Sequence, residues 1–328
     1  MMKSLKLTAL AVAAVALSGV AKADDFKPAI VFDMGGKFDK SFNEAAYNGA
    51  EAFKKDSGIK YMEFEVTQVS QREQAVKRMA KKGASIVVAM GFAQASAVEK
   101  AAKANPDTKF TIVDMVVDLP NVQSIIFKEH EGSFLVGMAA AMTSKTGKVG
   151  FVGGMDIPLI RKFALGYEEG AKYANPDAEV FQNMTGTTPA AWNDPTKGGE
   201  LAKSQFDRGA DVVYAAAGGT GIGVYQAAKD AGKFAIGVDS NQNYLHPGTM
   251  LTSMTKRVDV AVREAFETAK NGTWKPGIKV LGLKEGGVGY AVDEHNQSVL
   301  AKDIIAKLEQ ARADIISGKI KVTNYMAK

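Results

Sequence analysis

The alternation of short apolar runs with segments of helical periodicity constrains the fold of this chain more than any other feature. The runs are rich in β-branched residues, and the segments between them carry apolar residues three and four positions apart. Ten runs are expected to form strands: residues 29–33, 61–66, 85–90, 109–114, 122–127, 148–153, 179–184, 211–216, 234–239 and 249–254. Strands that alternate with helices in this way predict an α/β fold with doubly wound parallel sheets.

An internal repeat indicates that there are two such sheets. Residues 83–114 resemble residues 209–239, and each copy ends in an aspartate, Asp114 or Asp239, at the end of an expected strand. Open α/β sheets bind their ligands at the carboxyl ends of the strands. We therefore expect two similar lobes that face each other across a ligand-binding cleft, as in a clamshell.

Two of the expected helices begin at capping boxes. Ser41 is followed by Glu44, and Ser70 is followed by Glu73, so that a hydroxyl and a carboxylate can accept hydrogen bonds from free amides of the first turn. Phe42 falls on the apolar face of the first of these helices, and we assign it to the core.

The first 23 residues have the layout of a cleavable secretory signal peptide. Lys3 and Lys6 precede an apolar run at residues 7–20, and Ala21-Lys22-Ala23 supplies small residues before a cleavage point. The chain has no cysteine, the residue that carries the lipid of bacterial lipoproteins. We therefore expect a periplasmic protein that is soluble and not lipid-anchored.

Length, charge and cysteine content exclude several classes of protein. A chain of 328 residues favours two domains. It has 41 basic and 36 acidic residues, and removal of residues 1–23 leaves 38 basic residues, so nucleic acid is not an expected partner. Without cysteine there is no disulfide framework, no thiolate metal site and no cysteine nucleophile.

The sequence contains no motif of a known catalytic or metal site. HExxH, GxSxG and GxxxxGK[ST] are absent. His130, between Glu129 and Glu131, has no partner histidine nearby, and we expect a solvated or cap-region histidine. The glycine-rich residues 218–223 lack the spacing of a dinucleotide fingerprint, since Val224 stands where its last glycine would fall. We expect no enzyme, no metal and no cofactor, and a glycine turn whose amides approach a ligand.

Two aromatic residues are candidates to hold a flat ligand. Residues 33–43 combine two glycines, two aromatic residues, two aspartates and an asparagine between the first strand and the first helix. Phe38 in this segment and Trp192 in a polar turn of the other lobe are expected to stack on a heterocycle. The alternative for this segment is plain capping chemistry with Phe38 in the core.

A carboxylate and a lysine are candidates to hold sugar hydroxyls. Asp239 ends a strand and can accept hydrogen bonds from a ribose diol, and Lys256 follows the next strand. The alternative for Lys256 and Arg257 is the solvated start of the following helix.

Six ordered motifs resemble the basic membrane protein family of substrate-binding proteins, in particular its purine nucleoside receptor type. The motifs are GGKFDKSFNEAAYNG, GMDIPLIRKFALGYEEG, WNDPTKGGELA, GGTGIGVYQAA, GVDSNQ and LTSMTKRVD, and the resemblance runs from about Pro28 to the C-terminus. It implies a type I periplasmic binding protein fold, in which three crossovers join two doubly wound lobes and the ligand lies between them. We expect a signal peptide at residues 1–23, a first lobe of residues 24–128 and 246–274, and a second lobe of residues 129–245 and 275–328.

The resemblance also implies a purine nucleoside site of ten residues in the cleft. These are Phe38 and Trp192 on the faces of the base, Asn43 and Asp114 at its edge, Asp239 and Lys256 at the ribose, Gly219 and Gly221 as backbone contacts, and Asp33 and Met90 in the wall.

The expected partners follow from the same resemblance. A monomer would deliver guanosine, adenosine or inosine to the permease of an ABC importer, which is powered by a cytoplasmic ATPase, and would meet the membrane only through that permease. Two alternatives remain: the same clamshell for another small solute or as a sensor, and an enzyme of nucleoside metabolism, for which the sequence offers no catalytic pair.

Overall fold

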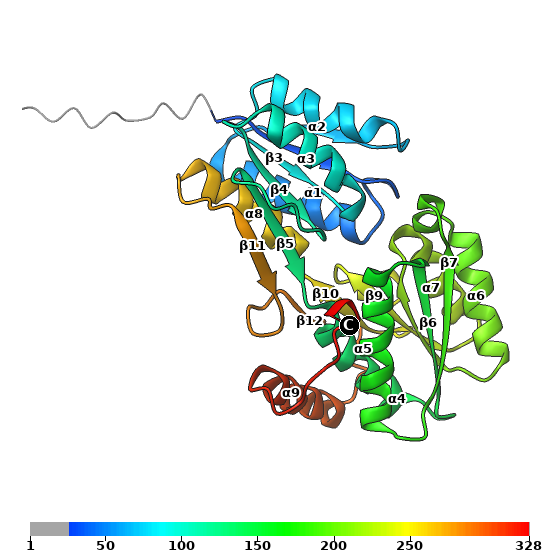
Figure 1. The fold of residues 1–328 in the computed structure, drawn as a ribbon. Coiled ribbons are helices and arrows are strands. Elements are labelled where there is room, and N and C mark those ends of the chain that lie inside the picture. The colour runs from blue at the N-terminus through cyan, green and yellow to red at the C-terminus, as the bar shows by residue number, and fades with distance from the viewer. Residues whose placement is uncertain (1–25, 328) are drawn as a thin grey trace, which may run out of the picture.

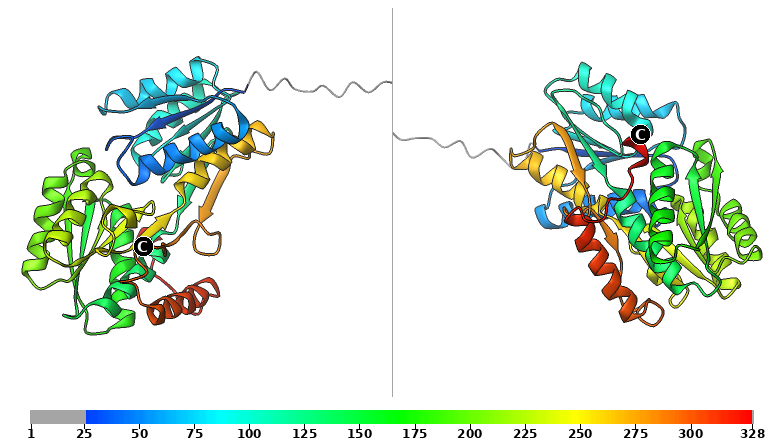
Figure 2. Two further views of the ribbon diagram at one scale, coloured as in Figure 1. Left: turned by 180° about the vertical axis from the view of Figure 1, so that it is seen from behind. Right: turned by 60° about the horizontal axis from the view of Figure 1, so that its bottom comes forward.

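The fold consists of two α/β lobes, each built on one six-stranded sheet (Figure 1). A computed structural model describes residues 26–327, so the predicted signal peptide at residues 1–23 lies outside the described residues. Within residues 26–327, no helix is both long enough and apolar enough to cross a bilayer. The left view of Figure 2 again shows the lobes side by side, joined where the chain passes from one to the other, a region that we call the hinge.

The first lobe has an entirely parallel sheet with strand order β11-β5-β4-β3-β1-β2. Its strands are β1 (Pro28–Phe32), β2 (Met62–Glu65), β3 (Ile86–Ala89), β4 (Lys109–Val113), β5 (Val122–Phe127) and β11 (Gly277–Leu281). Its helices are α1 (Phe42–Ser57), α2 (Gln71–Lys81), α3 (Ala95–Ala104) and α8 (Val258–Lys270). The apolar strand residues and the facing sides of these helices form the core.

The second lobe has strand order β12-β10-β9-β8-β6-β7, and β12 alone runs antiparallel to its neighbour among the strands described. Its strands are β6 (Lys148–Met155), β7 (Glu179–Gly186), β8 (Val212–Ala216), β9 (Phe234–Asp239), β10 (Met250–Lys256) and β12 (Val288–Tyr290). Its helices are α4 (Glu129–Thr143), α5 (Pro158–Ala174), α6 (Pro195–Asp207), α7 (Gly221–Asp230) and α9 (Lys302–Ile316).

The predicted fold class is confirmed, and the ten expected strands are all present within one or two residues of their predicted ends. Two strands were missed. β11 carries alternating apolar residues that stay exposed, Ile278 and Val280, and β12 has only three residues. Neither has the buried apolar run by which the other strands were found.

The expected lobe boundaries need correction at two of the three crossings. The first crossing, between β5 and α4, falls at residues 127–129 as expected. β10 pairs with β9 in the second sheet, so the second crossing lies at residues 256–258 and not at 245–246. β11 pairs with β5 in the first sheet, so the third lies after Leu281 and not at 274–275.

Helix α1 begins at a different cap from the one the sequence suggested. Ser41 makes no capping hydrogen bond, and the Asp39 carboxylate instead accepts hydrogen bonds from the amides of Ser41, Asn43 and Glu44 at 2.8–3.1 Å. Asp39 therefore satisfies the first turn and leaves the Ser41 hydroxyl available for another partner. The Ser70 hydroxyl likewise makes no capping bond to α2.

Candidate ligand-binding site

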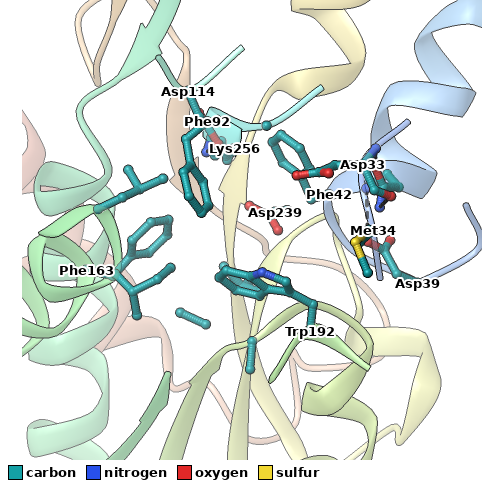
Figure 3. A pocket seen from close by; sticks show the side chains of 18 residues that line it. Asp33, Met34, Asp39, Phe42, Phe92, Asp114, Phe163, Trp192, Asp239 and Lys256 are labelled. Atoms are coloured by element: carbon teal, nitrogen blue, oxygen red, sulfur yellow. Dashed lines mark hydrogen bonds and ion pairs between the residues drawn. The ribbon is translucent and has the colours of Figure 1, made fainter. Parts of the chain in front are cut away.

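A pocket of about 620 Å³ lies between the lobes, where the carboxyl ends of the two sheets meet. Ten of the residues that line it are labelled in Figure 3: Asp33, Met34, Asp39, Phe42, Phe92, Asp114, Phe163, Trp192, Asp239 and Lys256. The pocket therefore draws side chains from both lobes.

Four aromatic rings project into this space (Figure 3). Phe42 is the first residue of α1, and Phe92 follows β3, so both come from the first lobe. Phe163 lies in α5, and Trp192 ends a 3₁₀ turn after β7, so both come from the second. Rings from both sides of a cleft can enclose a flat ligand.

The position of the Trp192 indole depends on the glycine beneath it. A Cβ atom at Gly154, in β6, would lie 2.1 Å from Cζ3 of Trp192 and 2.4 Å from Cε3. Any side chain at this position would collide with the ring. Gly154 therefore provides the space in which the indole lies along the pocket wall.

Three carboxylates of the pocket each have one oxygen already paired. Asp33 Oδ1 accepts from Nε and Nη2 of Arg72 at 3.1 and 3.0 Å. Asp114 Oδ2 lies 2.7 Å from Nζ of Lys256, and Asp239 Oδ2 accepts from Oγ of Ser41 at 2.5 Å. The second oxygen of Asp114 is buried and has no hydrogen-bond partner among the described residues. Such oxygens are acceptors that a ligand with N–H or O–H groups can satisfy.

Burial sets the acidity of these groups. It raises the pKa of Asp114 to about 6 and also raises that of Asp239, in each case against the opposing charge of Lys256. It raises the pKa of Asp39 to about 7, despite the three amides that stabilise its charged form. Burial acts in the opposite direction on Lys256, but the carboxylates of Asp114, Glu129 and Asp239 outweigh it and raise the pKa of the ammonium group.

The two aspartates at equivalent strand ends share an unusual backbone conformation. Asp114, after β4, has φ 70°, and Asp239, at the end of β9, has φ 63°. Aspartate enters this left-handed region more readily than most residues. The turn directs both carboxylates into the cleft, and it marks the internal repeat at the level of the backbone.

Six of the ten predicted site residues lie together in the pocket: Asp33, Asn43, Asp114, Trp192, Asp239 and Lys256. Asn43 differs from its expected role at the edge of a base. Its Oδ1 accepts from the amide of Asp33, and its Nδ2 donates to the carbonyls of Asp33 and Gly36, each at 3.2 Å. Its side chain therefore holds the loop before α1 in place.

The other four predicted residues do not line the pocket. Phe38 is 59% exposed, and its ring packs edge-on against Tyr47 with centroids 5.2 Å apart. Met90 is fully buried in the core of the first lobe. Gly219 and Gly221 are buried and do not line the pocket, whereas their neighbour Gly218 does.

Sequence reasoning also missed residues that do line it. Phe42 was assigned to the core because it shares a helical face with apolar residues, but as the first residue of α1 it reaches the cleft. Phe92 and Phe163 lie in segments whose apolar pattern predicts burial and gives no separate signal of a ligand site. Asp39 could have been found from its place three residues before the first residue of α1.

His130 lies in the cap region of α4, but it is not solvated. It is the second residue of that helix and is only 6% exposed. Burial and the nearby ammonium group of Lys162 lower its pKa to about 4.

Comparison with known proteins places these features in one family. Residues 26–325 match the sequence profile described as ABC transporter substrate-binding protein PnrA-like. The chain is 36% identical over 321 residues to the ABC transporter nucleoside-binding protein BmpA of Lactococcus lactis, with 91% of this chain and 89% of that protein covered. The fold is similar to the crystal structure of a solute-binding protein from an ABC transporter system of Aeropyrum pernix, with a TM-score of 0.83 and 30% sequence identity. The match covers 90% of this chain and 92% of that one.

The expectation of a soluble protein without a lipid anchor is wrong. A relative from Pyrococcus furiosus is named an uncharacterized lipoprotein. It is 38% identical to this chain over 283 residues, with 80% of this chain and 69% of that protein covered. Relatives from Pyrococcus horikoshii and Pyrococcus abyssi, each 37% identical, carry the same description. The expectation was based on the absence of cysteine from the sequence, and the basic and apolar N-terminal segment does not itself separate released proteins from those held at a membrane.

Proposed function

Because this chain belongs to the PnrA-like family of ABC transporter substrate-binding proteins, we propose that it captures purine nucleosides and delivers them to its permease. The family members are binding proteins and not enzymes, and they imply a ligand and an ABC permease as partners. Guanosine, adenosine and inosine are the proposed ligands, and a cytoplasmic ATPase is the proposed source of energy for uptake. The name of the Lactococcus lactis relative supports the nucleoside assignment.

The observation that carries the proposal is the combination of aromatic rings with half-satisfied carboxylates in one pocket. The rings of Phe42 and Trp192 come from opposite lobes and offer two faces for a planar base. The second oxygen of Asp114 has no partner among the described residues, and it and the carboxylates of Asp33 and Asp239 can accept hydrogen bonds from a ligand rich in N–H and O–H donors. A nucleoside joins a flat base to a sugar with hydroxyl groups and meets both demands.

The charge of the pocket argues against a nucleotide. Among the residues that line it, Lys256 is the only basic one, and it already faces Asp114 and Glu129 at 2.7 and 3.0 Å. Arg72, behind Asp33, is likewise paired. A phosphate would meet carboxylates without a free cation to balance it.

The proposed assignment differs from the sequence-based one at the base. Phe42, in place of Phe38, stacks opposite Trp192, and Asp33 and Asp114 accept hydrogen bonds from the edge of the base. Asp239 accepts from the ribose hydroxyls, and Lys256 donates to the same end of the ligand. Because each lobe supplies part of the contacts, the ligand stabilises the closed arrangement of the lobes.

Isothermal titration calorimetry on protein freed of carried ligand by unfolding and refolding tests the proposal. We expect binding of guanosine, adenosine or inosine, and no comparable binding of ribose, free guanine or guanosine monophosphate. Binding of ribose alone would point to a sugar carrier. Binding of no nucleoside by correctly refolded protein would contradict the proposal, and release of free base on incubation would favour an enzyme.

A further inference from the structure

Four charged side chains form a continuous buried chain that begins at the pocket and ends outside it. Asp114 Oδ2 faces Nζ of Lys256 at 2.7 Å, and the same Nζ lies 3.0 Å from Oε1 of Glu129. The other oxygen of Glu129 lies 2.5 Å from Nζ of Lys162. All four side chains are at most 7% exposed, but only Asp114 and Lys256 line the pocket.

The chain of charges crosses the hinge. Asp114 belongs to the first lobe, and Lys162 lies in α5 of the second. Glu129 and Lys256 lie at the first two crossings, at the start of α4 and the end of β10. The backbone at the start of a helix favours a negative charge, which suits Glu129 at its position.

Close packing of α4 and α5 brings Lys162 to Glu129. A Cβ atom at Gly166 would lie 2.5 Å from the carbonyl oxygen of His130, and one at Gly170 would lie 1.9 Å from that of Phe134. The two helix backbones can approach this closely only because these positions lack side chains. Lys162, one turn earlier on α5, also donates to the Phe127 carbonyl at 3.0 Å, which fixes its ammonium group at the hinge.

We propose that Glu129 and Lys162 are positioning residues of the ligand site. They hold the ammonium group of Lys256 against one oxygen of Asp114 and so leave the other oxygen of Asp114 for the ligand. Lys162 balances the second oxygen of Glu129, which keeps Glu129 between the two ammonium groups. The part of this inference that concerns ligand affinity rests on the proposed nucleoside function. The part that concerns the protonation of Asp114 does not.

The arrangement makes the two residues act on Asp114 in opposite directions. Glu129 shares the ammonium group of Lys256 with Asp114 and adds a negative charge, both of which raise the pKa of Asp114. Lys162 shares the carboxylate of Glu129 with Lys256 and adds a positive charge, so it has the opposite effect. The other groups that face this cluster are Asp239, whose charge also raises the pKa of Asp114, and His130, which is neutral above about pH 4.

The test compares Glu129→Gln and Lys162→Met with the wild-type protein in the absence of ligand. The ¹³Cγ resonance of Asp114, assigned by its loss in Asp114→Asn, is followed from pH 4 to pH 8. We expect a lower titration midpoint in Glu129→Gln and a higher one in Lys162→Met. Glu168→Gln and Lys172→Met are matched controls, because this pair, also on α5, is 31% and 52% exposed and lies outside the cluster. They should leave the midpoint unchanged.

Guanosine affinity at pH 7 provides the second measurement. We expect both Glu129→Gln and Lys162→Met to bind guanosine at least about tenfold more weakly than the wild type, and both controls to bind it as the wild type does. Circular dichroism establishes that each variant is folded, and if one of them does not fold, the other decides the question.

Two outcomes would overturn the inference. One is a shift of the Asp114 midpoint in the same direction in both variants, or none in either. The other is unchanged guanosine affinity in both folded variants when the wild type binds guanosine. A wild-type protein that binds no nucleoside would refute the proposed function instead. The Asp114 titration would still test the inference that Glu129 and Lys162 are positioning residues.

Discussion

Ser41 of the first lobe donates a hydrogen bond to Asp239 of the second, with Oγ and Oδ2 2.5 Å apart. Ser240 Oγ donates to the Ser41 carbonyl at 3.1 Å, and Gln242 Nε2 donates to the Lys40 carbonyl at 2.9 Å. The turn before α1 is thus joined to the turn after β9 by protein contacts alone. Asp239 therefore has a role between the lobes as well as in the ligand site.

This double role determines how Asp239 should be tested. Asp239→Asn keeps the shape of the side chain and suits the left-handed backbone, whereas alanine would add strain at φ 63°. A hydrogen bond to a charged acceptor contributes about 1.5–3 kcal/mol, so we expect the variant to bind guanosine at least about tenfold more weakly. Calorimetry measures the affinity, and an unchanged dissociation constant in a folded variant would remove Asp239 from the ligand site.

Phe42 and Phe38 form a matched pair for the stacking assignment. Phe42→Ala should weaken nucleoside binding by roughly 1–3 kcal/mol if its ring stacks on the base. Phe38→Ala should bind as the wild type does, because Phe38 lies outside the pocket and is 59% exposed. The same calorimetric titration measures both variants. Weaker binding in Phe38→Ala alone would restore the assignment made from the sequence.

Gly154 gives an indirect test of Trp192. The methyl group of Gly154→Ala would collide with the indole and displace it from the pocket wall. We expect weaker nucleoside binding and a changed tryptophan emission spectrum, to which Trp192 and Trp274 both contribute. In a double-mutant cycle, Trp192→Ala should weaken binding by roughly 1–3 kcal/mol in the wild type and by clearly less in Gly154→Ala. Additive losses would mean that the two positions act separately.

His130 predicts a loss of stability in acid. Its pKa is about 4 in the folded protein against 6.5 for an ordinary histidine, so the unfolded chain binds more protons between these values. Stability should therefore fall as the pH falls from 6.5 towards 4. His130→Gln lacks this contribution. Between pH 7 and pH 4.5, the free energy of unfolding of the wild type should therefore fall by roughly 2–3 kcal/mol more than that of the variant.

Urea denaturation at the two pH values measures this difference. The buried carboxyl groups with raised pKa values change stability in the opposite direction, but they are common to both proteins and cancel in the comparison. An equal response of the two proteins to pH would show that His130 takes up a proton without unfolding.

The sequence predicted those parts of the site that local pattern determines. Asp114 and Asp239 were found because a repeat places each at the end of a buried strand, and the structure gives them the same backbone turn. Phe42 was misassigned because helical periodicity shows that a face is apolar but not whether a neighbouring helix or a ligand covers it. Glu129 and Lys162 gave no signal, because their partner Lys256 is far away in the sequence.

The lobe boundaries show the same limit. β10 was assigned to the wrong lobe, and β11 was missed as a strand and its residues were assigned to the wrong lobe. Strand pairing depends on partners in other parts of the chain. Hydrophobic pattern identifies a strand, but it does not identify the sheet that the strand joins.

The three crossings have a consequence for synthesis of the chain on the ribosome. The sheet of the first lobe remains without its edge strand β11, and α1 remains without the helix α8 that packs on it, until residues 258–281 have been made. By then almost all strands of the second lobe have already been synthesised. Neither lobe can complete its core before the other has begun, so the nascent protein must carry an unfinished first lobe through most of translation.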